Sequence, residues 1–251
     1  MARNLKLTLA YDGHDFAGWQ VQPDHVTIQG MLVSVFEHLT GEKTLPQGSG
    51  RTDAGVHALA QTASVAIESP IPGANLVRAL NDLLPRSVRV LAVEEMPPEF
   101  HARKSAVAKT YKYRIFRDEI CPPFLARYVF HHPYPLDEAR MAEAATVVEG
   151  EHDFTSFAAV DPERNREGEE VNNVRTIFHS AWQRQGSELL YTVRGNGFLH
   201  HMVRNLVGTF LMVGKGSLKI EDVRRILDLR DRSAAAATAP ASGLFLVSVE
   251  Y

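Results

Sequence analysis

The sequence predicts an α+β fold made of two halves. Segments in which apolar and polar residues alternate, the pattern of half-buried strands, occur in both halves of the 251-residue chain. Segments with apolar residues three and four positions apart, the pattern of amphipathic helices, lie between them. Strand and helix alternate twice, with too few crossover helices for a long parallel sheet, so we expect predominantly antiparallel sheets. The halves are expected to meet near residues 96–108, with an N-terminal half at residues 1–104 and a C-terminal half at residues 105–251.

The first half contains clear start and stop signals for helices. Thr27 suits the N-cap of a helix, because its hydroxyl can accept a hydrogen bond from a backbone N–H of the first turn. Pro85 is expected to end the second helix, since proline lacks the N–H that continues helical hydrogen bonding. The expected elements are strands at residues 5–9, 59–67 and 88–93, and helices at residues 28–39 and 73–84.

The second half repeats this pattern. Residues 109–116 alternate strictly, as a strand does, and residues 197–213 are strongly apolar with helical composition. Only one strand follows the alanine-rich stretch at residues 234–241, so we expect a connector along the surface rather than a linker between domains. The expected elements are strands at residues 109–116, 174–182, 189–193 and 244–249, helices at residues 137–148, 197–213 and 220–229, and an exposed charged insertion at residues 162–173.

The composition is that of an ordinary globular protein. Hydrophobic residues make up 45% and charged residues 23% of the chain. There is no run of about 18 apolar residues, which a transmembrane helix needs, and the N-terminal residues lack the apolar core of a signal peptide. The single cysteine, Cys121, excludes an internal disulfide and is expected in a cytoplasmic protein. It adjoins Pro122-Pro123 with no nearby partner, so we interpret it as an ordinary side chain.

The charges exclude a uniformly basic nucleic-acid coat but allow a local basic cleft. The formal net charge is −3. The 11 histidines include adjacent pairs at residues 131–132 and 200–201. Adjacent side chains point in different directions and rarely bind one metal ion. No C-x-x-C or H-E-x-x-H pattern occurs, so the sequence supports no metal site.

A glycine-rich stretch at residues 48–58 is the first candidate for chemistry. Its three glycines permit positive φ angles and close backbone approach, and Arg51, Thr52, Asp53 and His57 lie among them. A polar loop that leads into a strand is a common place for catalytic residues, because the strand holds the loop rigid. The alternative is that Thr52 and Asp53 only form a turn. Composition alone favours that structural interpretation.

Two further positions are unusual for their surroundings. Arg204 lies within the apolar segment at residues 197–213, where an unpaired arginine is rarely buried. It either extends its charge to the surface or faces a carboxylate, for which Asp53 is the obvious candidate. Tyr111 lies in a strand rich in lysine and arginine. Cations for phosphates and aromatic rings for bases are the ingredients of RNA recognition, although a strand with outward cations and inward tyrosines is also commonplace.

Together these residues resemble the TruA-type family of tRNA pseudouridine synthases, and the likeness runs along the whole chain. The glycine-rich motif is its most specific part. Two positions depart from the usual pattern: Ser49 stands where alanine is frequent, and Lys104 where an aromatic residue is frequent. The matching stretches are Tyr11-Asp12-Gly13, Phe16-Ala17-Gly18-Trp19-Gln20 with Gln22, Gly48-Ser49-Gly50-Arg51-Thr52-Asp53-Ala54-Gly55-Val56-His57-Ala58, Leu80-Asn81, Leu84-Pro85, Phe100-His101-Ala102-Arg103, Lys109-Thr110-Tyr111-Lys112-Tyr113, Gly150 with His152-Asp153-Phe154-Thr155-Ser156-Phe157, Phe198-Leu199-His200-His201-Met202-Val203-Arg204 and Gly243-Leu244-Phe245-Leu246.

The resemblance implies that the protein isomerises uridines in the anticodon arm of tRNA to pseudouridine without a cofactor. Asp53 would be the nucleophile. Arg51 would help to extrude the nucleotide and occupy its place, because a base must leave the stack before its glycosidic bond can be reached. Tyr111 would stack on the flipped uracil, and its phenol would assist proton removal from C5. Arg204 would pair with Asp53 and keep it ionised.

The resemblance also implies a binding surface, a fold and an assembly. Leu244 would line the uracil pocket, and His57 and Arg103 would contribute to binding the RNA, although the residues alone favour a loop-shaping role for His57 and Thr52. The implied fold is two ferredoxin-like, RNA-recognition-like halves. A mainly antiparallel central sheet with helices on one side would join them, with the active cleft between the halves. The implied partners are tRNA and a second copy of the chain in a homodimer.

Two other classes of protein remain open at this point. One is a non-catalytic RNA-binding protein built from paired RNA-recognition-like halves, against which stands the complete set Arg51, Asp53, Tyr111 and Arg204. The other is a carboxylate-dependent hydrolase of nucleosides or glycosides. Such an enzyme usually needs a second catalytic carboxylate, and the glycine-rich motif contains only one.

Overall fold

The computed structural model describes residues 2–160 and 172–251, so most of the predicted insertion at residues 162–173 lies outside the described residues. The chain divides into two compact units. The first comprises Met1–Lys109 and Phe245–Tyr251, and the second comprises Thr110–Leu244. Residues 245–251 thus join the first unit, whereas the sequence analysis assigns them to the second half. None of the described helices is long and apolar enough to cross a membrane.

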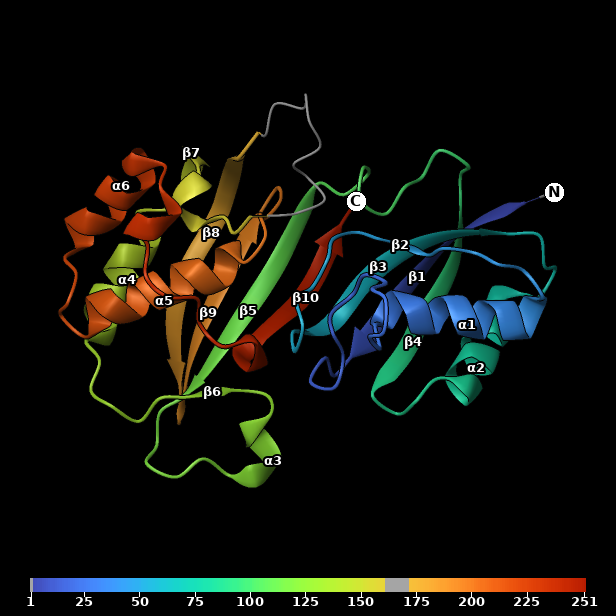
Figure 1. Cartoon of the computed structure of the whole chain (residues 1–251), viewed down its shortest axis with the longest axis horizontal. Coiled ribbons are helices and arrows are strands. Elements are labelled where there is room, and N and C mark those ends of the chain that lie inside the picture. Colours follow the sequence, from blue (N-terminus) through green and yellow to red (C-terminus); the bar gives the residue numbers. More distant parts are fainter. Residues whose placement is uncertain (1, 161–171) are drawn as a thin grey trace. The chain divides into compact units, whose positions relative to one another are not determined.

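The first unit contains a sheet in the order β4-β1-β3-β10 and two helices. Strand β1 pairs antiparallel with both β3 and β4, whereas β10 runs parallel to β3. Helices α1 and α2 contact each other and lie in front of the strands in Figure 1. The elements of this unit are β1 (Arg3–Tyr11), α1 (Ile28–Thr40), β2 (Gln47–Gly48), β3 (His57–Ile67), α2 (Gly73–Leu83), β4 (Val88–Met96) and β10 (Leu244–Glu250).

The signals read from the first half are confirmed. Leu5, Leu7 and Leu9 are fully buried on one face of β1, as alternation predicts. Thr27 caps α1 by accepting a hydrogen bond from the Gly30 N–H at 3.2 Å. Helix α2 ends at Leu83, just before the proline that was expected to stop it.

The second unit contains a sheet in the order β5-β9-β8-β7, with β6 beside β5. Strands β8 and β9 form an antiparallel hairpin, β7 pairs antiparallel with β8, and β6 pairs parallel with β5. Helix α4 contacts α5, α6 and β8. The elements of this unit are β5 (Ala108–Phe116), which begins in the first unit, α3 (Pro123–Ala126), β6 (Phe130–His131), α4 (Glu138–Thr146), β7 (Gly150–Asp153), β8 (Val174–Gln185), β9 (Glu188–Gly195), α5 (Met202–Gly214) and α6 (Ile220–Leu229).

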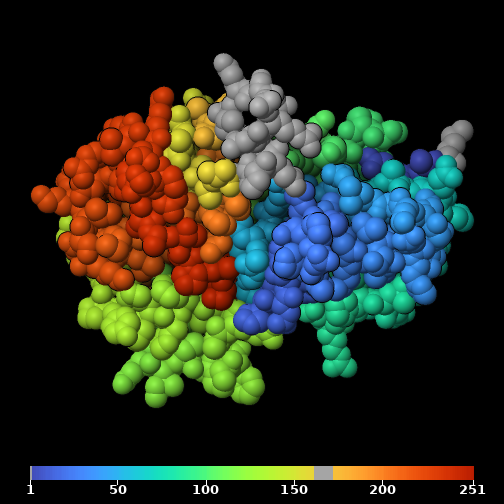
Figure 2. Space-filling model, viewed as in Figure 1, coloured from blue at the N-terminus to red at the C-terminus, as the bar shows by residue number. Residues whose placement is uncertain are grey.

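Two features of the second unit differ from the sequence analysis. Helix α5 begins at Met202 rather than at residue 197, because His201 takes a left-handed conformation with φ of 60°. The preceding apolar residues therefore form an irregular segment. The short elements α3, β6 and β7 were not expected. The segment that carries α3 and β6 projects from the unit, yellow-green in Figures 1 and 2.

The alanine-rich connector lies along α5, as the sequence predicts, and residues 234–240 are called the strap below. Thr209 of α5 accepts a hydrogen bond from the Ala236 N–H at 3.3 Å. The Asn205 Oδ1 accepts hydrogen bonds from Thr238 at 2.7 Å and from Arg232 at 3.0 Å. Close approach depends on Gly208, where an added Cβ would lie 2.0 Å from the Ala237 carbonyl oxygen. The strap is therefore fixed by hydrogen bonds to its backbone and to the Thr238 hydroxyl.

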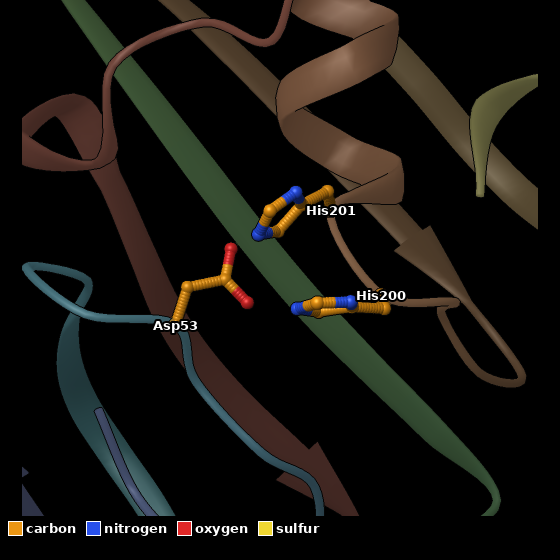
Figure 3. Close-up of side chains that lie close together, drawn as sticks. All are labelled: Asp53, His200 and His201. Carbon is orange, nitrogen blue, oxygen red and sulfur yellow. The ribbon is translucent and has the colours of Figure 1, made fainter. Parts of the chain in front are cut away.

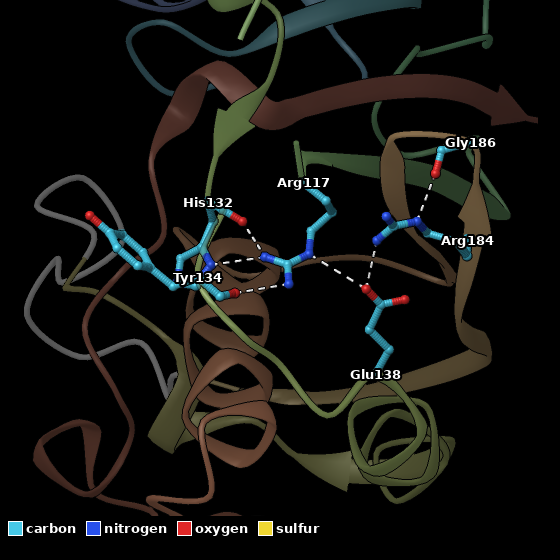
Figure 4. A network of polar contacts seen from close by, with 6 residues as sticks. All are labelled: Arg117, His132, Tyr134, Glu138, Arg184 and Gly186. Atoms are coloured by element: carbon cyan, nitrogen blue, oxygen red, sulfur yellow. Dashed lines mark hydrogen bonds and ion pairs between the residues drawn. The ribbon is translucent and has the colours of Figure 1, made fainter. Parts of the chain in front are cut away.

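A second polar network joins four segments of this unit (Figure 4). Arg117, which follows β5 and is almost fully buried, donates to the carbonyl oxygens of His132 and Tyr134 and to the His132 Nδ1. Its Nε lies 3.5 Å from the Glu138 Oε1, to which the Arg184 guanidinium also donates at 2.7 Å. The segment after β6, the start of α4 and the β8–β9 hairpin are thereby held to the end of β5.

Gly208→Ala is expected to destabilise the second unit. The new methyl group would overlap a backbone oxygen that cannot swing away, so the free energy of unfolding should fall by about 1–3 kcal/mol. Urea unfolding followed by circular dichroism measures this. Gly30→Ala in α1 is the control, because the nearest atom to its Cβ would be the Thr27 Oγ1 at 3.0 Å and alanine favours a helix. Equal stability of the Gly208→Ala protein and wild type would contradict the tight packing.

The network in Figure 4 predicts a pH dependence of stability. Burial, Lys215 and Arg117 lower the pKa of His132 below its usual 6.5. The unfolded state therefore binds more protons on acidification, and this contribution to stability is lost as the pH falls below 6.5. His132→Gln should flatten the pH dependence of the free energy of unfolding between about pH 5 and 7. His131→Gln, which changes an exposed neighbour, is the control, and identical slopes in all three proteins would refute the assignment.

Candidate active site

The glycine-rich stretch forms a loop that leaves β2 and enters β3. The Ser49 N–H donates to the Thr62 carbonyl at 2.7 Å, and the Asp53 carbonyl accepts from the Val56 N–H at 3.1 Å. Gly55 has a φ of 78°, which closes this turn in a conformation that glycine adopts readily. Arg51 is exposed and Asp53 is partly exposed, whereas Thr52 between them is buried. The side chain of Asp53 is drawn in Figure 3.

Buried polar side chains hold this loop on both sides of Arg51. The Gln61 side chain accepts from the Ser49 hydroxyl at 2.7 Å and donates to the Gly50 carbonyl at 3.0 Å. The Tyr11 hydroxyl lies 2.8 Å from the Thr52 hydroxyl, and burial raises the pKa of Tyr11 to about 12, so its proton is retained. The loop therefore has satisfied backbone groups without belonging to a sheet.

The loop also rests on the aromatic segment at residues 16–20. The Trp19 N–H donates to the Thr52 carbonyl at 3.0 Å. Gly18 has a φ of 95°, and an added Cβ there would lie 2.6 Å from the Thr52 oxygen. At Gly48 an added Cβ would meet the Trp19 ring at 2.6 Å. The glycine-containing segments at residues 16–20 and 48–58 therefore pack directly against each other.

His57 is buried at the start of β3, with an exposed fraction of 1%. Its Nδ1 accepts a hydrogen bond from the Gly13 N–H at 3.1 Å, and its ring stacks on Phe245 with centroids 4.7 Å apart. The Asp12 Oδ1 also lies 3.2 Å from this nitrogen. A nitrogen that accepts the Gly13 N–H carries no proton, so we do not interpret the Asp12 contact as an ion pair. These contacts suit the loop-shaping role, and contact of His57 with RNA stays a prediction.

Arg103, the other predicted RNA-binding residue of this unit, is exposed in the turn after β4. Its N–H donates to the His101 Nδ1 at 3.1 Å. The turn itself is anchored, because the Ala102 N–H donates to the buried Ser64 hydroxyl at 3.1 Å. Arg103 therefore extends from a fixed backbone position.

The second unit positions Tyr111, Arg204 and Leu244. Tyr111 is buried on β5, where its ring meets the edge of Phe198 at 5.0 Å between centroids. Arg204 lies in the first turn of α5, and its Nε donates to the Ala239 carbonyl of the strap at 2.8 Å. Leu244 is buried at the start of β10. The His200 and His201 rings, drawn in Figure 3, lie 4.0 Å apart just before α5.

The structure brings the predicted residues together in two sets. Arg51 and Asp53 lie in one loop of the first unit and His57 begins the strand that follows it, while Tyr111 and Arg204 belong to the second unit. The pairing of Asp53 with Arg204 therefore stays a prediction.

Sequence reasoning missed the side chains that support each set. Gln61 is one of them, and its only signal was a long polar side chain within the mainly apolar strand at residues 59–67.

Replacing Gln61 with leucine is expected to loosen the loop without changing its sequence. Leucine has similar volume but leaves the Ser49 hydroxyl and the Gly50 carbonyl without their buried partner, which costs about 1–3 kcal/mol in stability. Hydrogen exchange of the amides at residues 49–53 should accelerate. Asn81→Leu is the matched control, because Asn81 bonds both backbone groups of Val90 in the same unit, away from the loop. Equal loop protection in the two variants would count against Gln61 as the support.

Comparison with known proteins places the chain in a family. A family model described as tRNA pseudouridine synthase matches residues 8–103 and 144–251. A tRNA pseudouridine synthase A from Solibacter usitatus is 56% identical over 99% of this chain and 100% of its own. One from Latilactobacillus sakei is 42% identical over the full length of both. A crystal structure of a Cbf5-Nop10-Gar1 complex aligns with a TM-score of 0.36 and 10% identity, over 96% of this chain and 57% of that one, which is too distant to support an argument. The chain belongs to the tRNA pseudouridine synthase family.

Proposed function

We propose that this protein isomerises uridine in tRNA to pseudouridine. The observation that carries the proposal is the match along nearly the whole chain, combined with a rigidly supported loop that presents one arginine and one carboxylate. In the reaction the bond from C1′ of the ribose to N1 of uracil breaks and a bond from C1′ to C5 forms. C5 then loses its proton and N1 takes one up, so that the product is an isomer of the substrate. No redox change occurs, so the reaction needs no electron carrier.

Asp53 is the nucleophile in this proposal. A carboxylate can attack the sugar or the base, or assist departure of the uracil anion, without a cofactor. Its support is the turn between Thr52 and Val56, whose backbone is fixed by Tyr11, Trp19 and the Asp53 carbonyl itself. A nucleophile on so constrained a backbone loses little entropy on reaching the reactive geometry.

Three side chains serve the extruded nucleotide. Arg51 is exposed next to the nucleophile and takes the place of the uridine that leaves the stack. Tyr111 stacks on the flipped uracil, and its phenol assists removal of the C5 proton. Arg204 pairs with the Asp53 carboxylate and stabilises its charge.

The finer features of the function are proposals too. The substrate region is the anticodon arm, the protein acts as a cytoplasmic homodimer, and each half resembles a ferredoxin-like module with the active cleft between the halves. In this scheme the half at residues 1–104 supplies the nucleophile, and the half at residues 105–251 supplies Tyr111, Arg204 and Leu244. His57 and Arg103 assist RNA binding. Pseudouridine mapping of total tRNA before and after treatment with the protein identifies the target positions, and sedimentation analysis gives the oligomeric state.

Asp53→Asn is expected to abolish isomerisation while tRNA binding persists. The amide has the shape of the carboxylate but not its nucleophilicity, so the rate should fall at least about 10³-fold. Tritium release from tRNA labelled at C5 of uridine measures the rate, and a gel-shift assay measures binding.

Asp24→Asn is the matched control, an exposed aspartate of the same unit with a φ of 60°, which asparagine tolerates. Tritium release at the wild-type rate by the Asp53→Asn protein would refute the role of Asp53. A wild-type protein that binds tRNA but releases no tritium would instead identify a non-catalytic RNA-binding protein.

A further inference from the structure

Tyr113 is a fully buried tyrosine of β5, two positions after Tyr111. Its hydroxyl donates a hydrogen bond at 2.7 Å to the carbonyl of Pro240, which is the last residue of the strap. Gly243 lies directly against the ring, because an added Cβ there would be 2.8 Å from two of its carbon atoms. The phenol therefore contacts the chain on both sides of the short turn at Ala241–Gly243. With its oxygen bonded to a backbone carbonyl and its ring covered, Tyr113 is not available to stack on a base.

The residue before Pro240 in the strap is bound to Arg204. The Arg204 Nε donates to the Ala239 carbonyl at 2.8 Å, and the Ala239 N–H donates to the Arg204 carbonyl at 3.1 Å. These reciprocal hydrogen bonds join one residue of α5 to one residue of the strap. Proline fixes its own φ angle, so the carbonyls of Ala239 and Pro240 are coupled through a stiff link.

Fixing the Nε of an arginine sets the direction of the whole guanidinium group. The group is planar and presents its donors in a rigid fork, so a bond at Nε restricts rotation of the plane that carries both Nη atoms. Burial raises the pKa of Tyr113 well above its usual value, with the nearby charge of Arg204 opposing part of that rise. The phenol is therefore protonated and acts as a steady donor to the strap.

We propose that Tyr113 is a positioning residue for Arg204, acting through Pro240 and Ala239 to hold the guanidinium in its reactive orientation. This inference rests on the proposed function, in which Arg204 pairs with the nucleophile. It assigns the second tyrosine of the strand a task different from that of Tyr111: one faces the substrate and the other holds a catalytic partner.

Other contacts keep the strap attached when the phenol is removed. Thr238 remains bonded to Asn205, and the Ala236 N–H remains bonded to Thr209. Tyr113→Phe should therefore leave the fold intact and release only the last part of the strap, at residues 239–240. An intact fold with a released end of the strap would indicate a positioning role, whereas general support of the structure would show as a loss of stability.

The test compares Tyr113→Phe with Tyr191→Phe. Tyr191 lies on β9 in the same unit, is also fully buried, and loses one buried hydroxyl contact, to Ser180 at 2.8 Å. Under single-turnover conditions, Tyr113→Phe should form pseudouridine about ten-fold more slowly, with unchanged affinity for tRNA. Tyr191→Phe should keep the wild-type rate. A wild-type rate in Tyr113→Phe would overturn the inference, as would a slowing of the same size in Tyr191→Phe.

A double-mutant cycle tests whether Tyr113 acts through Arg204. In an Arg204→Lys background, which lacks the Nε fork, Tyr113→Phe should cause no further slowing. An additional ten-fold loss in that background would contradict the inference.

A third measurement does not depend on activity. The Nε–H signal of Arg204, assigned by its loss in Arg204→Lys, should exchange with water faster in Tyr113→Phe than in wild type or Tyr191→Phe. If wild type forms no pseudouridine, the proposed function fails. The exchange rates then decide whether Tyr113 holds Arg204, with equal rates overturning the inference.

Discussion

The requirement that buried backbone groups find hydrogen-bond partners governs both parts of the candidate site. The loop at residues 48–53 leaves the sheet after β2, so its carbonyls need partners from elsewhere. Gln61 and Lys109 supply them, with the Lys109 Nζ 2.5 Å from the Ser49 carbonyl and the Gln61 amide on Gly50. Without these side chains the buried carbonyls of the loop would lack partners, which destabilises this conformation, and the loop would adopt many conformations. The position of Asp53 is a consequence of that support.

The second unit solves the same problem with different residues. Its strap has almost no side chains to pack, so polar groups of α5 and β5 bind its backbone. In both places a glycine lets two backbones approach: Gly18 beneath Thr52, and Gly208 beneath Ala237. An irregular segment held in this way can be as well ordered as a strand. Its exposed positions can still carry the side chains that binding or catalysis needs.

The sequence was most informative where a repeating pattern or a familiar motif existed. Alternation located β1, and the Thr27 cap located the start of α1, because both depend on local geometry. The helix predicted from residue 197 begins later, since apolar composition does not reveal the left-handed turn at His201. Gln61 could not be identified as a support, because a polar residue in a strand usually faces water and only the fold shows that this one is buried. The glycine-rich motif singled out Asp53, and the apolar surroundings singled out Arg204, but their pairing depends on long-range geometry that periodicity does not encode.

Under the proposed function, Asp53 and Arg204 are supported by different units, and this affects how the binding energy of tRNA is used. The backbone around Asp53 and the Nε of Arg204 are each held by contacts inside their own unit, so neither position has to be ordered by tRNA. Preorganised charges cost no reorganisation when the transition state forms. The favourable energy of phosphate contacts is then available to offset the cost of removing the uridine from its stack. Such a division of tasks requires a supported loop at Asp53, a strap bonded to Arg204, and an exposed Arg51 beside the nucleophile.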